Sequence, residues 1–231
     1  MAQPGTGHPT NGQFFWVADN VIANDFPDVS TALRHPDGLL AIGGNLEPGT
    51  LLKAYQRGIF PWYSQGQPIL WWSPDPRCVL DPGQVKISRS LAKTLKKNKF
   101  KVTFNRAFAD VVRHCAAPRA GDTDTWITPD MASAYIRLHK LGHGISTECW
   151  RDGVLAGGLY GVAVGRVFFG ESMFSLVPDA SKVALVSLAE MLNRRQFRII
   201  DCQVQSRHLQ SLGAGLMPRD VFINILKHYC S

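Results

Sequence analysis

Residues 145–170 read ISTECWRDGVLAGGLYGVAVGRVFFG, and this stretch decides the fold of the second half of the chain. It is rich in β-branched, aromatic and other apolar residues, and it is interrupted by Asp152-Gly153 and by Gly165, which are typical of tight turns. We therefore expect three consecutive strands, over residues 145–150, 154–164 and 166–170.

Helices and further strands are expected on both sides of these three strands. Thr128 is a predicted N-cap with Pro129 at the first helical position, and Gly142 ends that helix. The other predicted helices cover residues 88–97, 106–115, 181–194, 206–212 and 218–229, and the other strands cover 100–104 and 197–204. This order resembles a GNAT-type acetyltransferase domain, in which helices cover both faces of a mixed sheet. We predict an α+β fold.

The first third of the chain has a different texture. Residues 55–77 read YQRGIFPWYSQGQPILWWSPDPR, which suits neither a long helix nor an ordinary strand. We expect residues 14–80 to be irregular, apart from one helix that starts near Glu47-Pro48 and closes at Gly58. The rings of the aromatic segment are predicted to form a rigid surface that grips flat or apolar ligand groups, although each ring alone could simply pack a core. A boundary near residues 81–83 would divide the chain into domains 1–80 and 81–231.

Composition indicates an ordinary globular protein. The chain has 231 residues, of which 45% are hydrophobic, and no apolar run approaches the ~20 residues of a membrane span. The first 13 residues are polar without a signal-peptide core, so we expect a cytoplasmic protein. The five cysteines include no Cys-x-x-Cys pair, which favours free thiols. His139 and His143 have a metal-like spacing but no Glu between them, and we expect no metal.

Positive charge is concentrated in one segment. The net charge is +7, and residues 85–109 hold eight Lys or Arg and no acidic residue. A polyanionic partner such as a nucleic acid would explain this segment, whereas the plainer interpretation is a solvated helix face.

Three segments together resemble the leucyl/phenylalanyl-tRNA-protein transferase family: PDGLLAIGGN at 36–45, GESMFS at 170–175 and IDCQV at 200–204. The resemblance extends from about residue 26 to 226. It implies an enzyme that moves Leu or Phe, and possibly Met, from aminoacyl-tRNA to the N-terminal Arg or Lys of an acceptor protein. That transfer would mark the acceptor for degradation by the N-degron route. An aminoacyl ester is already activated, so no metal or organic cofactor is expected.

The resemblance implies that Asp201 and Gln203 are the catalytic pair. Because they are two residues apart on a predicted strand, we expect their side chains on the same face. Asp201 would orient and polarise Gln203, whose amide oxygen would accept a hydrogen bond from the attacking amine. The proton could leave by water, the ribose hydroxyl or a carboxylate. The alternative is a buried Asp and Gln that are bonded only to structure.

The other site residues also follow from the resemblance. Glu171, expected at a strand end, would lie near the α-amino group of the carried amino acid. Tyr55 and Trp62 are candidates for stacking on the terminal adenine. The walls of an apolar side-chain pocket would be Trp62, Trp126, Leu159, Phe168, Met173 and Ile200. The acceptor stem of the tRNA would contact Lys86, Arg89, Lys93, Lys96 and Lys97. Two positions depart from the family pattern, Leu159 for an expected Met and Ser206 for an expected Asn.

Two other function classes stay open. The order of elements also permits a coenzyme A-dependent N-acetyltransferase, but residues 171–182 lack the glycines that would close on a pyrophosphate. Basic charge and aromatic rings alone would equally allow a non-catalytic RNA-binding or peptide-reading protein.

Overall fold

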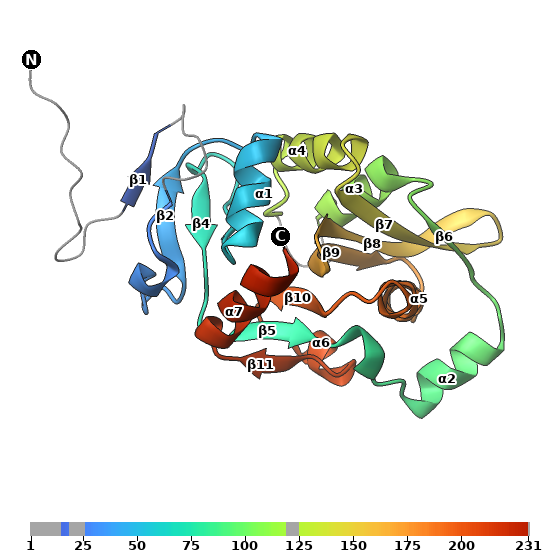
Figure 1. Cartoon of the computed structure of the whole chain (residues 1–231). Helices are drawn as coiled ribbons and strands as arrows, with labels where there is room; N and C mark the ends of the chain where they lie inside the picture. The colour runs from blue at the N-terminus through green and yellow to red at the C-terminus, as the bar shows by residue number, and fades with distance from the viewer. Residues whose placement is uncertain (1–14, 19–25, 119–124, 231) are drawn as a thin grey trace, which may run out of the picture.

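The computed structural model describes residues 15–18, 26–118 and 125–230, and its larger sheet has seven strands (Figure 1). These are β5 (Arg77–Leu80), β6 (Lys101–Phe104), β7 (Gly144–Arg151), β8 (Val154–Val164), β9 (Val167–Ser175), β10 (Ile199–Gln203) and β11 (Gly215–Met217). They are ordered β11-β5-β10-β9-β8-β7-β6. β10 is parallel to β9 and the other neighbours are antiparallel. The predicted α+β class with a mixed sheet is confirmed.

The three strands predicted from residues 145–170 are all present. β7 and β8 match their predicted ranges closely, and both are joined to their successors by the predicted turns, with positive φ at Asp152, Gly153 and Gly165. β9 is longer than expected, since it continues to Ser175 beside β8. The prediction that Glu171 lies at a strand end was therefore wrong, because Glu171 is inside β9.

Helices cover both faces of this sheet, as predicted. α3 (Phe108–Ala116) and α4 (Pro129–Lys140) pack on one face and α5 (Ala180–Arg194) on the other (Figure 1). The predicted cap of α4 is present, since the Thr128 hydroxyl accepts from the main-chain N–H of Met131. Successive side chains of a strand point to opposite faces. Leu159 accordingly packs in the α5 cluster and Tyr160 in the cluster of α3 and α4.

The N-terminal third is more regular than expected. A four-stranded sheet has the order β1-β2-β4-β3, so the prediction of irregular structure outside one helix was wrong. Its strands are β1 (Phe15–Val17), β2 (Leu39–Gly43), β3 (Phe60–Pro61) and β4 (Leu70–Trp72). A short 3-10 helix, η1, covers Val29–Thr31, and α1 covers Pro48–Gln56. Of the aromatic segment, Phe60, Tyr63 and Trp71 are buried, so these rings serve the core and not an exposed surface.

β5 precedes the expected domain boundary and yet pairs with β10 and β11 in the larger sheet. One buried cluster also joins Tyr55 and Ile59 of the N-terminal part to Tyr135 and Phe169 of the second part. After β5 come a 3-10 helix, η2 (Pro82–Gln84), and the basic helix α2 (Arg89–Lys96). The division at residue 80 stays a prediction.

The chain closes with α6 (Arg207–Ser211), β11 and α7 (Arg219–Tyr229), of which the two helices were predicted and β11 was not. In the described part of the chain, no helix has the length and apolarity to cross a membrane, and no group of side chains is suited to hold a metal. The Nδ1–H of His139 donates to the Gly144 carbonyl, and the His139 ring stacks on Phe108. None of the five cysteines, all of which lie in the described part of the chain, forms a disulfide bond.

Candidate active site

The site lies where two neighbouring strands separate. β9 and β10 are paired in parallel only as far as Phe169 and Asp201. Beyond that point β9 continues beside β8, whereas β10 keeps only its pairing with β5, through Gln203. A cavity of about 700 Å³ opens between the separated ends, and a smaller hollow of about 130 Å³ adjoins it.

A β-bulge marks each strand at this separation. In β9, Glu171 is the extra residue, because Gly170 pairs with Gly161 and Ser172 with Tyr160. In β10, Cys202 is the extra residue between Asp201 and Gln203, which face Val79 and Cys78 of β5. Bulges re-aim side chains and are frequent beside active sites.

The bulge in β10 overturns the expectation that Asp201 and Gln203 point to the same face of a regular strand. Gln203 has φ of 54°, which lies in the left-handed region and not in the extended one. Simple alternation along a strand therefore does not describe Asp201 and Gln203. Asp201 is fully buried, whereas the side chain of Gln203 lines the cavity.

The residues expected to form the amino-acid pocket are brought together. Trp62 lines the smaller hollow, and Trp126, Glu171 and Gln203 line both spaces. The larger cavity also has an apolar wall of Leu159, Phe168, Met173, Leu185, Leu188 and Ile200. An apolar cavity with a few polar groups is the usual form of a small-molecule site.

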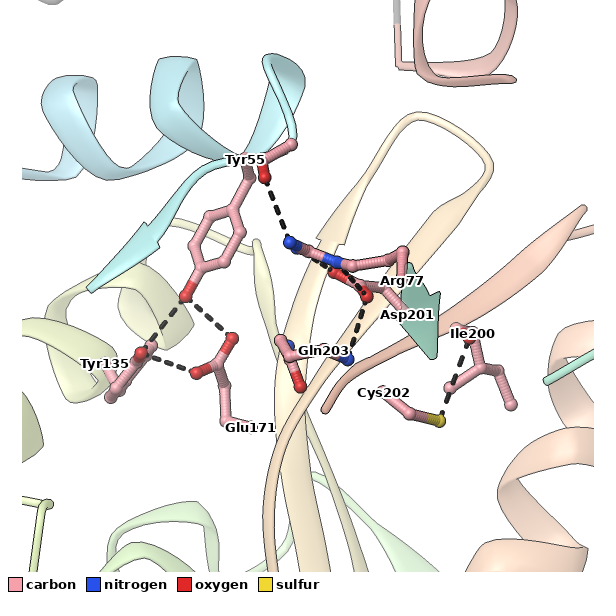
Figure 2. Close-up of polar contacts among 9 residues, drawn as sticks. Tyr55, Arg77, Tyr135, Glu171, Ile200, Asp201, Cys202 and Gln203 are labelled. Atoms are coloured by element: carbon pink, nitrogen blue, oxygen red, sulfur yellow. Dashed lines mark hydrogen bonds and ion pairs between the residues drawn. The ribbon is translucent and has the colours of Figure 1, made fainter. Parts of the chain in front are cut away.

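Glu171 lies in a cluster of tyrosines at the edge of this cavity. Its carboxylate accepts hydrogen bonds from the Tyr55 hydroxyl (2.7 Å) and the Tyr135 hydroxyl (2.6 Å), as Figure 2 shows. Burial raises the pKa of Glu171 to about 7, while the two tyrosine hydrogen bonds act to lower it. The site therefore holds a carboxyl group that titrates near neutral pH and that a bound cation would keep ionised.

The two candidates for adenine stacking differ in exposure. Tyr55 is 0% exposed and packs on Phe169, so its ring has no free face for a base. Trp62 is 41% exposed, and its carbonyl accepts a hydrogen bond from the indole N–H of Trp72 (2.7 Å). We therefore keep the stacking hypothesis for Trp62 alone, and Tyr55 acts through its hydroxyl on Glu171.

Asp201 is held by a residue that the sequence did not single out. The Arg77 guanidinium donates to both carboxylate oxygens, from Nε to Oδ1 at 2.8 Å and from Nη2 to Oδ2 at 2.7 Å. Oδ1 also accepts from the main-chain N–H of Gln203 at 3.0 Å. The bond between Asp201 and Gln203 thus runs through the main chain, whereas polarisation of the carboxamide was expected.

Three residues that line the cavity each carry a buried polar atom without a partner among the described residues. Among the described residues, the Tyr160 hydroxyl, Gln203 Nε2 and His208 Nε2 are buried and make no hydrogen bond, and all three residues line the cavity. Buried polar groups in native proteins normally have partners. These atoms indicate that the cavity is built to receive a ligand with polar groups.

The basic residues expected to bind tRNA are all exposed. In the described part of the chain none of Lys86, Arg89, Lys93, Lys96 and Lys97 takes part in an ion pair. α2 packs on α5, whose Leu185 and Leu188 line the cavity. The Thr94 hydroxyl donates to Asp179 at 2.9 Å and joins the two helices. A positive surface is therefore attached to a wall of the site.

Family models match most of the chain. The model described as leucyl/phenylalanyl-tRNA protein transferase matches residues 79–227, and the model for the N-terminal domain of the same protein matches residues 44–75. The chain belongs to the leucyl/phenylalanyl-tRNA protein transferase family. The family predicted from the three sequence segments is thereby confirmed, together with its transferase class.

Curated relatives agree with this assignment. A leucyl/phenylalanyl-tRNA–protein transferase from Aromatoleum aromaticum is 61% identical over 198 residues, which cover 86% of this chain and 84% of that protein. One from Azoarcus sp. is 57% identical over 207 residues, covering 90% and 87%. Among solved structures, a GCN5-related N-acetyltransferase from Kribbella flavida has a TM-score of 0.38 and 12% identity, over 74% of this chain and 61% of that one. The fold class rests on the sheet order itself.

Sequence reasoning missed several residues of this candidate site. Arg77 closes the aromatic segment, but nothing in its neighbours indicates the distant partner Asp201. Tyr135 is one of the buried residues of α4, and nothing in the sequence indicates that its hydroxyl contacts Glu171. His208 and Tyr160 likewise look like ordinary element residues until the cavity brings them together.

Proposed function

We propose that the chain transfers Leu or Phe from aminoacyl-tRNA to the N-terminal Arg or Lys of acceptor proteins, with Met as a further candidate for the carried amino acid. The observation that carries this proposal is the single cavity in which an apolar wall, Glu171 and Gln203 meet. The acceptors would be marked for degradation by the N-degron route. Because charged tRNA is a substrate, the proposal includes a cytoplasmic location.

The apolar wall supports recognition of the carried side chain. Leu159, Phe168 and Ile200 are almost fully buried around the cavity, so a leucine or phenylalanine side chain would exchange water for apolar contacts there. Glu171 then supplies the charge for the α-ammonium group of the same amino acid. When the apolar wall holds the side chain and Glu171 holds the α-ammonium group, the ester of the same amino acid is held in one orientation.

Gln203 is proposed to serve the bond-forming step. The amine of the acceptor attacks the ester carbon, the carbon–nitrogen bond forms, and the bond to the ribose oxygen breaks. Holding the two reactants together can supply about 7–11 kcal/mol of the barrier in favourable cases. The Gln203 carboxamide oxygen would accept from the amine, and Nε2, which is without a partner among described residues, would donate to the developing oxyanion.

Asp201 is not proposed as the proton acceptor. Both of its oxygens already accept from Arg77, and one also accepts from the Gln203 main chain. A carboxylate engaged in this way orients its neighbours. The proton released by the amine would therefore leave to the departing ribose oxygen or to water.

The basic surface is proposed to hold the acceptor stem through phosphate contacts. Replacing Lys93, Lys96 and Lys97 together by alanine should reduce the slope of log affinity against log salt by roughly 2 to 3. Wild-type binding should therefore lose roughly 15- to 60-fold more affinity than the variant between 50 and 200 mM salt. Filter binding of leucyl-tRNA at several salt concentrations measures this. Equal salt slopes for the two proteins would remove α2 from the tRNA site.

A transfer assay tests the function itself. Radiolabelled leucine on tRNA, mixed with a protein that begins with Arg, should become protein-bound label that resists base hydrolysis. The same acceptor beginning with an acetylated Arg is the control and should stay unlabelled. A thermal shift with acetyl-coenzyme A and no label transfer would instead favour the acetyltransferase alternative. Binding of tRNA without either activity would favour a non-catalytic RNA-binding protein.

A further inference from the structure

Arg77 connects two walls of the cavity from a fully buried position. Its side chain is sandwiched between the rings of Phe60 and Phe222, with the guanidinium carbon 4.7 and 4.9 Å from the ring centres. Beyond its two bonds to Asp201, Nη1 donates to the Gly58 carbonyl at 3.1 Å. Gly58 closes α1 and lies just before the segment that carries Trp62. One guanidinium is thus bonded both to β10 and to the backbone that follows α1.

The hydrogen bonds that start at Arg77 pass through Asp201 to the main-chain N–H of Gln203. Asp201 Oδ1 accepts from Arg77 Nε and from the Gln203 N–H, as Figure 2 shows. Gln203 has φ of 54°, a conformation that L-residues adopt at a cost and keep only when their surroundings hold them. The Asp201 carboxylate is the group that holds the Gln203 N–H, and Arg77 fixes that carboxylate.

We propose that Arg77 is a positioning residue for aminoacyl transfer, acting through Asp201 to keep the carboxamide of Gln203 directed into the cavity. This inference rests on the proposed function. Arg77 does not line the cavity and so does not touch substrate. A fork with two fixed donors defines the plane of the carboxylate, which the single ammonium of a lysine does not do.

The alternative is that Arg77 serves stability alone, and a double-mutant cycle separates the two. Arg77→Lys keeps the charge but loses the fork. In the wild-type background it should lower kcat by about 10- to 100-fold, because small displacements of a positioned group have effects of that size. In the Gln203→Ala background the same change should lower kcat by less than about threefold, since the group that Arg77 positions is already missing.

Arg219 provides a matched control in the same region. It is a largely buried arginine that donates to the Ser73 carbonyl at 2.6 Å and pairs with Asp75, but it has no bond to Asp201 or Gln203. Arg219→Lys should leave kcat unchanged. KM for aminoacyl-tRNA should change little in Arg77→Lys, because the apolar wall and Glu171 are untouched.

Amide hydrogen exchange gives a readout that does not depend on turnover. A peptide covering residues 201–205 should exchange faster in folded Arg77→Lys than in wild type or Arg219→Lys. Equal losses of kcat in both backgrounds, or unchanged exchange at these residues, would overturn the proposal. If wild type itself transfers no label, the proposed function fails, and the exchange result still decides whether Arg77 holds Gln203.

Discussion

Replacement of Gln203 by alanine is expected to lower kcat for aminoacyl transfer by about 10²- to 10³-fold, the usual effect of removing one preorganised group that contacts a developing oxyanion. The carboxamide contributes mainly when the amine attacks, because the apolar wall and Glu171 already bind the aminoacyl group. KM for aminoacyl-tRNA should therefore stay within a few-fold of the wild-type value. Single-turnover transfer of labelled leucine to an acceptor beginning with Arg measures this.

Gln205 is the matched control for this prediction. It is exposed, lies two residues further along and does not line the cavity. Gln205→Ala should keep the wild-type rate and the wild-type unfolding midpoint. If Gln203→Ala transfers leucine as fast as this control, the carboxamide has no part in the reaction and the catalytic assignment is lost.

The sheet of the second half could be predicted because its signals are local. Turn residues at Asp152-Gly153 and Gly165 separate apolar strands, and Thr128 with Pro129 starts a helix, so neighbours in sequence are enough to define each element. β11 and the strands of the N-terminal sheet are two to five residues long. Such short strands form because partners distant in sequence lie beside them, and their own residues give little indication of this.

Several polar residues of the candidate site were predicted, but the geometry of the site was not. The motif resemblance selected Glu171, Asp201 and Gln203, and the structure places all three where β9 and β10 separate. The two bulges could not be read from the sequence, because an extra residue is defined only against a partner strand. Arg77 was missed for the same reason, since its contact with Asp201 spans 124 positions of the chain.

Exposure decided which aromatic predictions hold. Composition marks Tyr55 and Trp62 as similar aromatic candidates, and only packing distinguishes them. Tyr55 is enclosed by α4 and β9 elements, with its hydroxyl on Glu171, whereas the Trp62 ring is partly open beside the smaller hollow. A ring at the end of a helix can turn either way, and the core that it joins is assembled from distant segments.

Replacement of Glu171 by glutamine should weaken binding of the aminoacyl group and change the pH dependence of stability. A charge-assisted hydrogen bond to the α-ammonium contributes about 1.5–3 kcal/mol, so affinity should fall roughly 10- to 100-fold. A leucyl-tRNA analogue with an amide in place of the ester measures binding without turnover. The same analogue without its α-amino group should bind wild type and Glu171→Gln equally. Equal affinities for the amino-bearing analogue would exclude Glu171 from ammonium binding.

The stability effect follows from the sign of the pKa shift. Burial raises the pKa of Glu171 from an ordinary value of 4.5 to about 7 in the folded protein. Between these two values the folded state keeps the proton that the unfolded state has lost, so the free energy of unfolding falls as pH rises. The free energy of unfolding falls by at most about 3 kcal/mol, and the fall is complete above pH 7. Water that enters the cavity and reaches the carboxylate makes this fall smaller.

Glu171→Gln should lack this component of the pH dependence. Urea unfolding at pH 4.5 and at pH 8 should show the variant gaining stability relative to wild type as the pH rises. Burial destabilises the carboxylate of wild type when it ionises, whereas the glutamine side chain stays neutral at both pH values. Glu190→Gln, which alters an exposed carboxyl on α5, should follow the wild-type curve. The same titration predicts that wild type binds the amino-bearing analogue more weakly below pH 7, where Glu171 is protonated and cannot pair with the ammonium. Parallel stability curves for wild type and Glu171→Gln would show that the pKa of Glu171 is not raised to near neutral pH, and the predicted weakening of analogue binding below pH 7 would be lost with it.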